Sequence, residues 1–204
     1  LIAAHFAIAA LSPLFVRWWG RRAFLALAVI PFATFAWALS LTPRIEDGEQ
    51  ITQAWAWLPG LKLELAFTMG TLQWLMALIV SGIGVLVLSY CAWYFDDDDP
   101  ALAMFSGVFT AFAGAMLGLV LADDLLLLFV FWELTTVFSY LLIGSDPAKR
   151  ASRVAAMQAL IVTTLGGLAM LVGMLMIGQE AGTHRISAIL ADPPSGTYVN
   201  IAVA

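Results

Sequence analysis

One ionisable side chain, Glu133, lies near the middle of an apolar run that extends from Leu125 to Gly144. The run is long enough to cross a bilayer as one helix, for which about 20 apolar residues suffice. A carboxylate at that depth costs roughly 3 kcal/mol on insertion scales. Because intramembrane acids are by default functional, the position predicts that Glu133 is a proton relay. The alternative is a neutral acid that only hydrogen-bonds to a neighbouring helix.

Further polar residues recur on the same side of this run. Thr136 and Tyr140 follow Glu133 at spacings of three and seven, which places all three on one face of a helix. With Thr163 of the next apolar run, they are candidates for lining a hydrated path. The same face is equally consistent with burial against other helices.

The composition identifies the class of protein. Of the 204 residues, 62% are hydrophobic and only 11% are charged, which excludes a soluble domain and predicts an integral protein of the lipid bilayer. The single cysteine, Cys91, has no partner here for a disulfide or a metal site, and no metal or other cofactor is expected. Nine Lys and Arg residues with no basic cluster beside aromatics argue against nucleic-acid binding.

The apolar runs predict an all-α polytopic membrane protein with about six transmembrane helices. These helices are expected at residues 1–16, 23–41, 70–95, 101–121, 125–144 and 151–177. The chain then divides into two N-terminal helices (1–41), a hairpin (42–68), a third helix with an acidic loop (69–100), helices four to six (101–178), and a link with the start of a further helix (179–204). Since the chain begins inside an apolar run without Met, we expect it to be part of a longer polypeptide.

A period of two distinguishes residues 51–68 from the helices. Apolar and polar side chains alternate on both sides of Pro59-Gly60, which is a turn signal. The pattern predicts a β-hairpin on the membrane surface, where Trp55 and Trp57 suit the headgroup zone. An irregular loop is the alternative.

Small residues recur in the helix expected at 101–121. Gly107, Ala111, Gly114 and Gly118 follow one another at spacings of four, three and four. Such a stripe favours close contact between helix backbones, so these glycines are predicted to be packing residues. Room for a chain of water molecules is the other possibility.

The remaining polar residues have simpler explanations. Asp123 and Asp124 are expected to form the turn before residue 125 and to cap the following helix. His5 is expected to lie at the membrane interface, with a proton relay as the weaker alternative. The run from Asp96 to Asp99 lacks the alternate ligand spacing and the Gly turn of a calcium loop, which favours a solvated loop.

Basic residues predict the orientation, because they concentrate on the cytoplasmic side. Six of them lie in the loops after the first and fifth helices, and these are Arg17, Arg21, Arg22, Lys149, Arg150 and Arg153. Only Arg44, Lys62 and Arg185 lie on the opposite side. The start of the chain and the hairpin are therefore predicted to be external.

Several motifs resemble a known family. They are Ser81–Tyr90, Gly114–Ala122, Leu127–Leu134 and Ser139–Gly144, together with the run Gly-Gly-Leu-Ala-Met-Leu at residues 166–171. These are similar to the antiporter-like subunits, which include the large A subunit of multi-subunit (Mrp-type) Na⁺/H⁺ antiporters and the proton-pumping membrane subunits of respiratory complex I. Trp132-Glu133-Leu134 resembles the antiporter A subunit more than complex I, where Trp-Glu-Gly is expected. Met69 departs from the family, which has Asp before Gly70.

The resemblance implies a function as well as a fold. In the family, a glutamate at the position of Glu133 pairs with a lysine on a later helix, which here would lie beyond residue 204. The resemblance implies five-helix inverted repeats, the first starting with the helix at 101–121. It implies a secondary transporter rather than an enzyme, which exchanges Na⁺ for H⁺ together with other small membrane subunits in the plasma membrane of a prokaryote. The alternatives are a proton-pumping subunit of a complex I-type quinone oxidoreductase and a non-transporting structural subunit.

Overall fold

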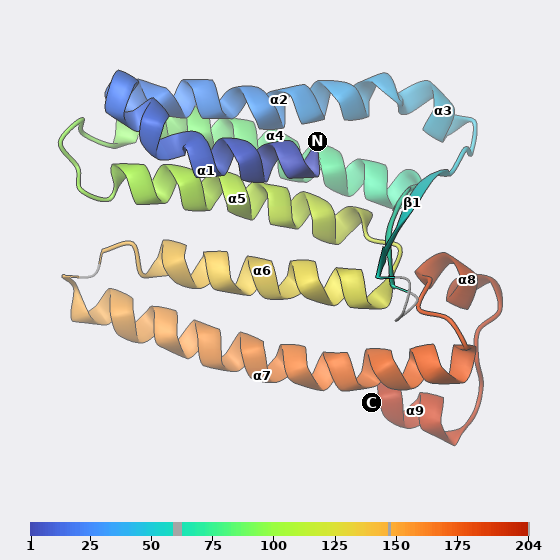
Figure 1. Cartoon of the computed structure of the whole chain (residues 1–204). Coiled ribbons are helices and arrows are strands. Elements are labelled where there is room, and N and C mark those ends of the chain that lie inside the picture. Colours follow the sequence, from blue (N-terminus) through green and yellow to red (C-terminus); the bar gives the residue numbers. More distant parts are fainter. Residues whose placement is uncertain (59–62, 147, 204) are drawn as a thin grey trace.

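Long helices account for most of the molecule (Figure 1). The computed structural model describes residues 1–58, 63–146 and 148–203. The long helices are α1 (Ile2–Trp19), α2 (Ala23–Ser40), α4 (Thr71–Tyr94), α5 (Leu102–Leu121), α6 (Leu125–Ile143) and α7 (Arg150–Ala181). Five stretches are long and apolar enough to cross a membrane, and the first of them, Ile2–Ser40, contains both α1 and α2. These two helices pack against each other and are joined by the 3-10 turn η1 (Gly20–Arg22). The predicted all-α polytopic fold is confirmed.

The ends of the helices follow from local chemistry. Gly20 ends α1 with φ 54° and Gly182 ends α7 with φ 66°, a left-handed conformation that residues with a Cβ rarely adopt. Asp124 begins α6, where its carboxylate accepts hydrogen bonds from the backbone N–H groups of Leu126 and Leu127 at 2.9 and 3.0 Å. The expected cap at Asp124 is therefore confirmed.

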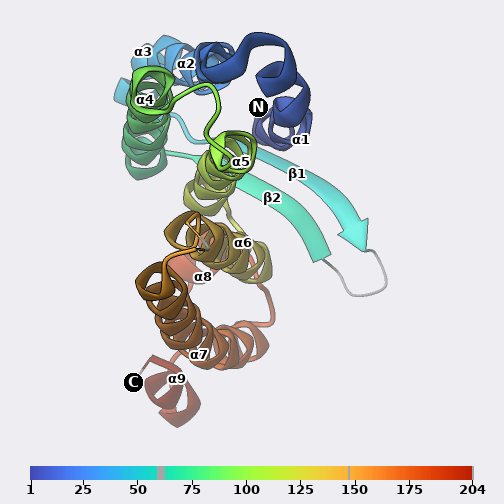
Figure 2. The ribbon, with the colours of Figure 1, turned by 90° about the vertical axis from the view of Figure 1, so that its left-hand side faces the viewer.

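The helices form a cluster with an extension on one side. α1, α2, α4 and α5 pack together, while α6 lies between α5 and α7 (Figure 2). The short helix α9 (Thr197–Val203) lies against α7. α6 therefore contacts a helix on two sides, while Val130 and Val137 in its middle turns stay exposed.

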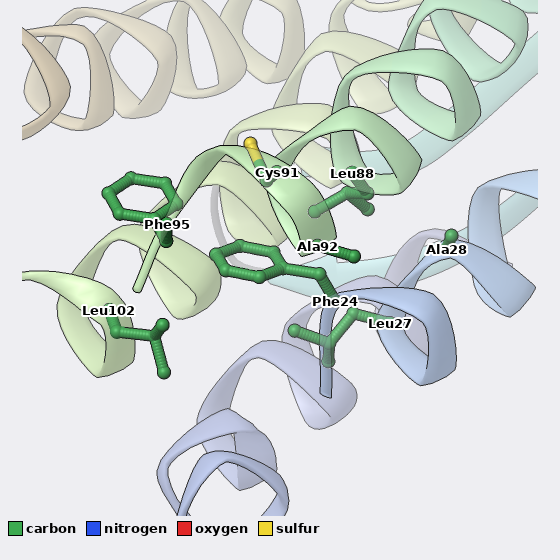
Figure 3. Packing of buried hydrophobic residues seen from close by; sticks show 8 residues of the cluster. All are labelled: Phe24, Leu27, Ala28, Leu88, Cys91, Ala92, Phe95 and Leu102. Carbon is green, nitrogen blue, oxygen red and sulfur yellow. The ribbon is translucent and has the colours of Figure 1, made fainter. Parts of the chain in front are cut away.

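Aromatic and aliphatic side chains fill one end of the four-helix cluster (Figure 3). The rings of Phe24 on α2 and Phe95 stack with centroids 5.5 Å apart, and Leu27, Leu88 and Leu102 are buried around them. Burying an aromatic or aliphatic side chain of this size contributes about 2 kcal/mol where water is the alternative. This core fixes α2, α4 and the start of α5 relative to one another.

The predicted hairpin is present at the other end of the bundle (Figure 1). Strand β1 (Ile51–Leu58) pairs antiparallel with β2 (Leu63–Met69). The register aligns Ile51 with Met69 and Trp55 with Leu65. The predicted turn at Pro59-Gly60 lies outside the described residues. Phe67 joins the hairpin to the helices, because its ring lies 6.1 Å from the ring of Phe131 on α6.

Several elements differ from the prediction. Thr42–Glu46 forms a short helix, α3, in which Pro43 occupies the first turn, a position where its missing N–H costs nothing. α7 continues to Ala181 rather than residue 177, since Gly178 to Glu180 extend the helix before Gly182 ends it. The short helix expected at residues 185–190 is α8 (Ile186–Ala191).

Candidate functional site

The carboxyl group of Glu133 lies at the contact between α6 and α7. Its Oε1 atom is buried and has no hydrogen-bond partner among the described residues. Gly167 of α7 lies directly against it, because a Cβ atom placed on Gly167 would collide with Glu133 Oε1. The same Cβ would lie 3.4 Å from the indole Nε1 of Trp132. Since buried polar atoms are nearly always hydrogen-bonded, an unpartnered acid in this position calls for an explanation beyond packing.

One other buried side-chain atom in the described part of the chain has no hydrogen-bond partner, the Oγ of Ser12 on α1. Ser12 packs against Gly107 of α5, and its hydroxyl does not exchange a proton near neutral pH. Both residues have an unpartnered buried oxygen, but Glu133 also carries a titratable proton, which Ser12 lacks.

The other predicted path residues have different surroundings. Thr136 on α6 is buried, with 6% of its surface exposed, and Tyr140 is half-buried. Thr163 on α7 is exposed, and its hydroxyl donates to the carbonyl oxygen of Ala159 in its own helix at 2.7 Å. The hydroxyl of Thr163 is therefore already occupied by its own helix, and a path-lining role for these three residues stays a prediction.

The glycines of α5 face two different helices. A Cβ on Gly107 would lie 2.5 Å from Ser12 Oγ, and one on Gly114 would lie 2.5 Å from His5 Cβ, so both face α1. Gly118 instead lies against the ring of Phe131 on α6. α5 is therefore placed at close range between α1 and α6, which positions the helix that carries Glu133.

His5 is buried inside the bundle, and its expected place at the membrane interface stays a prediction. Only 1% of its surface is exposed, because the ring packs at the close approach of α1 to Gly114. Its Nδ1 lies 3.1 Å from the carbonyl oxygen of Leu1.

An ionic cluster forms around the buried Asp123, away from Glu133, and it was not predicted from the sequence. Asp123 is 1% exposed and accepts hydrogen bonds from the backbone and the hydroxyl of Ser187, both at 2.8 Å. Arg185 donates to the Asp123 carboxylate at 3.1–3.2 Å and to Glu64 of the hairpin at 3.1 Å. The expected capping role of Asp123 is therefore wrong, since its carboxylate binds the segment after α7. No local signal predicts this pairing, because Asp123 and Arg185 are 62 residues apart in sequence.

Further ion pairs lie near the ends of helices, among them Arg21 with Asp97 at 3.9 Å. Arg44 of α3 donates to Glu49 at 2.6 Å, and this hydrogen bond lowers the pKa of the Glu49 carboxyl. Lys149 lies 2.8 Å from Asp146 and lowers the pKa of that carboxyl in the same way. Both pairs lie at helix ends rather than in the apolar middle of the bundle, where Glu133 is placed.

Two families of membrane subunits match the chain. Residues 122–200 match the family described as "NADH:quinone oxidoreductase/Mrp antiporter, TM", and residues 55–106 match "NADH-Ubiquinone oxidoreductase (complex I), chain 5 N-terminus". Glu133 and Gly167 both fall inside the first match.

Curated relatives carry antiporter names. The chain is 39% identical over 166 residues to the probable K⁺/H⁺ antiporter A/B subunit of Rhizobium meliloti, covering 81% of this chain and 16% of the relative. It is 35% identical over 162 residues to the Na⁺/H⁺ antiporter A1 subunit of Staphylococcus haemolyticus, covering 78% and 20% respectively. The chain thus spans about a fifth of the length of these relatives.

Solved structures share the fold. A chain of the Mrp complex from Dietzia sp. superposes with a TM-score of 0.82 at 36% identity, over 94% of this chain and 20% of that one. A chain of the membrane-bound sulfane sulfur reductase, an archaeal respiratory membrane complex, gives a TM-score of 0.81 at 20% identity, over 99% of this chain and 41% of that one. The second match shows the fold alone.

Proposed function

This chain belongs to the antiporter-like family of membrane subunits that includes the Mrp-type A subunits, and on that premise we propose that it forms part of the proton and cation path of a multi-subunit monovalent cation/proton antiporter. Glu133 is the intramembrane acid of this path. Na⁺ is the proposed cation. The chain works in secondary transport and catalyses no chemical reaction, with other membrane subunits as partners in the plasma membrane of a prokaryote.

The buried, unpartnered Oε1 atom of Glu133 carries the proposal. A group that relays protons must exchange them with a neighbour, and a buried oxygen without a fixed donor leaves that position available. The described ion pairs do not include Glu133, which lies in the middle of α6. A merely structural acid would be expected to hydrogen-bond within the bundle.

The flux test uses the complete complex in inverted membrane vesicles. After respiration has established a pH gradient, added Na⁺ is expected to release protons, which a pH-sensitive dye reports. Parallel additions of K⁺ and Li⁺ identify the cation, and vesicles that lack this protein give the background. Equal signals with and without the protein would contradict the proposal.

A redox-driven proton pump is the second candidate, because the description of one matching family also names NADH:quinone oxidoreductase. In that case the complex would co-purify with flavin and iron–sulfur subunits. It would also acidify inverted vesicles on addition of a reductant, without a cation gradient. Higher identity to the Mrp complex, 36% against 20% for the respiratory reductase, favours the antiporter.

We also propose that the hairpin is external, from the distribution of basic residues. Cysteine in place of the exposed Gln53 on β1 is expected to react with a membrane-impermeant thiol reagent in intact cells. Cysteine in place of the exposed Arg150 is expected to react only after permeabilisation. Both variants are made in a background without native cysteines, including Cys91→Ser. The reverse labelling pattern would invert the topology.

A further inference from the structure

We propose that Gly167 of α7 is a positioning residue for Glu133, and that its missing side chain forms the space in which the Glu133 carboxyl group sits. The inference rests on the proposed function of Glu133 and names the residue that sets the location of its proton. Hereafter this space is called the Gly167 slot, bounded by Gly167, Trp132 and Glu133.

The steric evidence is direct. A Cβ atom on Gly167 would collide with Glu133 Oε1 and would lie 3.4 and 3.5 Å from Nε1 and Cδ1 of the Trp132 indole. Gly167 and Glu133 Oε1 are both buried, so no water lies between the glycine and the carboxyl oxygen at their contact. No other side chain type leaves room for the carboxyl in this position.

The glycine is not required by the helix. Gly167 does not have a positive φ, and it lies in the interior of α7, where alanine would be more favourable by about 1 kcal/mol. A glycine that weakens its own helix is explained if another group needs the space. That group is the carboxyl of Glu133.

The adjacent residue provides a matched control. A Cβ on Gly166 would meet nothing within 4 Å in the described part of the chain, and Gly166 is exposed. The two glycines share the same helix and the same propensity, and they differ in what they face. An effect on the helix alone would therefore appear in both variants.

The nature of the collision predicts which atoms move. Glu133 Oε1 is the far end of a flexible side chain, so the carboxyl can swing away while the two helix backbones stay in place. Gly167→Ala is therefore expected to leave assembly intact and to displace the proton-carrying group. Small displacements of a reacting group can lower rates by up to about 100-fold.

The experiment compares Gly167→Ala with Gly166→Ala in the complete complex, at matched levels of assembled protein. Cation-driven proton flux is expected to fall about tenfold or more in Gly167→Ala and to stay within about twofold of the parent in Gly166→Ala. Equal flux in the two variants would overturn the positioning role. If Glu133→Gln abolished flux in the same assay, the proposed function would still stand.

A second variant separates positioning from packing. Glu133→Asp retracts the carboxyl by one methylene and vacates the Gly167 slot. In this background, adding Gly167→Ala is expected to change flux by less than about twofold, because the collision no longer exists. The same double variant decides the case if Gly167→Ala alone assembles poorly. Restored assembly in the double variant supports the positioning role of Gly167. Poor assembly in the double variant overturns it, and so does a loss of flux on adding Gly167→Ala that is as large as in the parent.

Discussion

Replacing Glu133 with glutamine is expected to leave assembly intact and to lower cation-driven proton flux by about 100-fold or more, the contribution of a positioned acid–base group. Glutamine keeps the length and shape of the side chain at the contact with Gly167, so the packing of α6 on α7 is preserved. Its amide cannot exchange a proton in the way a carboxyl does. The measurement is dye-reported proton release from inverted vesicles after addition of Na⁺, at matched levels of assembled complex.

The conservative control is Glu133→Asp, which keeps the acid but shortens its reach. We expect intermediate flux, because the proton still exchanges but from a displaced position. Near-normal flux with glutamine would show that the proton does not pass through residue 133. The buried acid would then be a packing residue.

Introducing leucine at Gly114 is expected to prevent normal assembly. A Cβ at this position already lies 2.5 Å from His5 Cβ and 3.7 Å from the carbonyl oxygen of Ile2. The colliding atom, His5 Cβ, is the root of a buried side chain on α1, and it cannot swing aside as a carboxyl end can. Overpacking costs typically about 1–3 kcal/mol, and here it forces α1 away from α5.

The yield of assembled complex in native gels measures this effect. Met116→Leu in the same helix is the control, because it conserves volume and is expected to cost less than about 1.5 kcal/mol. Normal yield and flux in Gly114→Leu would mean that the α1–α5 contact adapts more readily than its buried geometry indicates.

The sequence located the long helices and the hairpin because their signals are local. A run of about 20 apolar residues predicts a membrane span, and the alternation of apolar and polar residues over 61–68 predicts a strand. Glu133 was equally visible, since a charge inside an apolar run is costly whatever surrounds it. The bounds of α7 were less visible because Gln179 and Glu180 continue a helix that hydropathy alone would end.

Features that depend on distant partners were not predictable. The burial of His5 follows from the close approach of Gly114, which lies on a different helix. The start of α3 is an exception, because Pro43 in its first turn is a local signal that was overlooked. The Gly167 slot could not be predicted, because the sequence does not show whether Gly166 or Gly167 faces α6.

The Asp123–Arg185–Glu64 cluster also constrains the order of events during biosynthesis. Arg185 follows Glu64 by 121 residues, so the hairpin, α4, α5, α6 and α7 are all synthesised before this cation exists. Before that point, the start of α6 can already be joined to the hairpin by the hydrogen bond from the Asp123 N–H to the carbonyl oxygen of Ala66. Closure of this end of the bundle must follow insertion of α7, and it is a late, long-range step of the kind that slows folding. In a chain stalled before residue 185, Asp123 would therefore lack the cation with which it pairs in the folded protein.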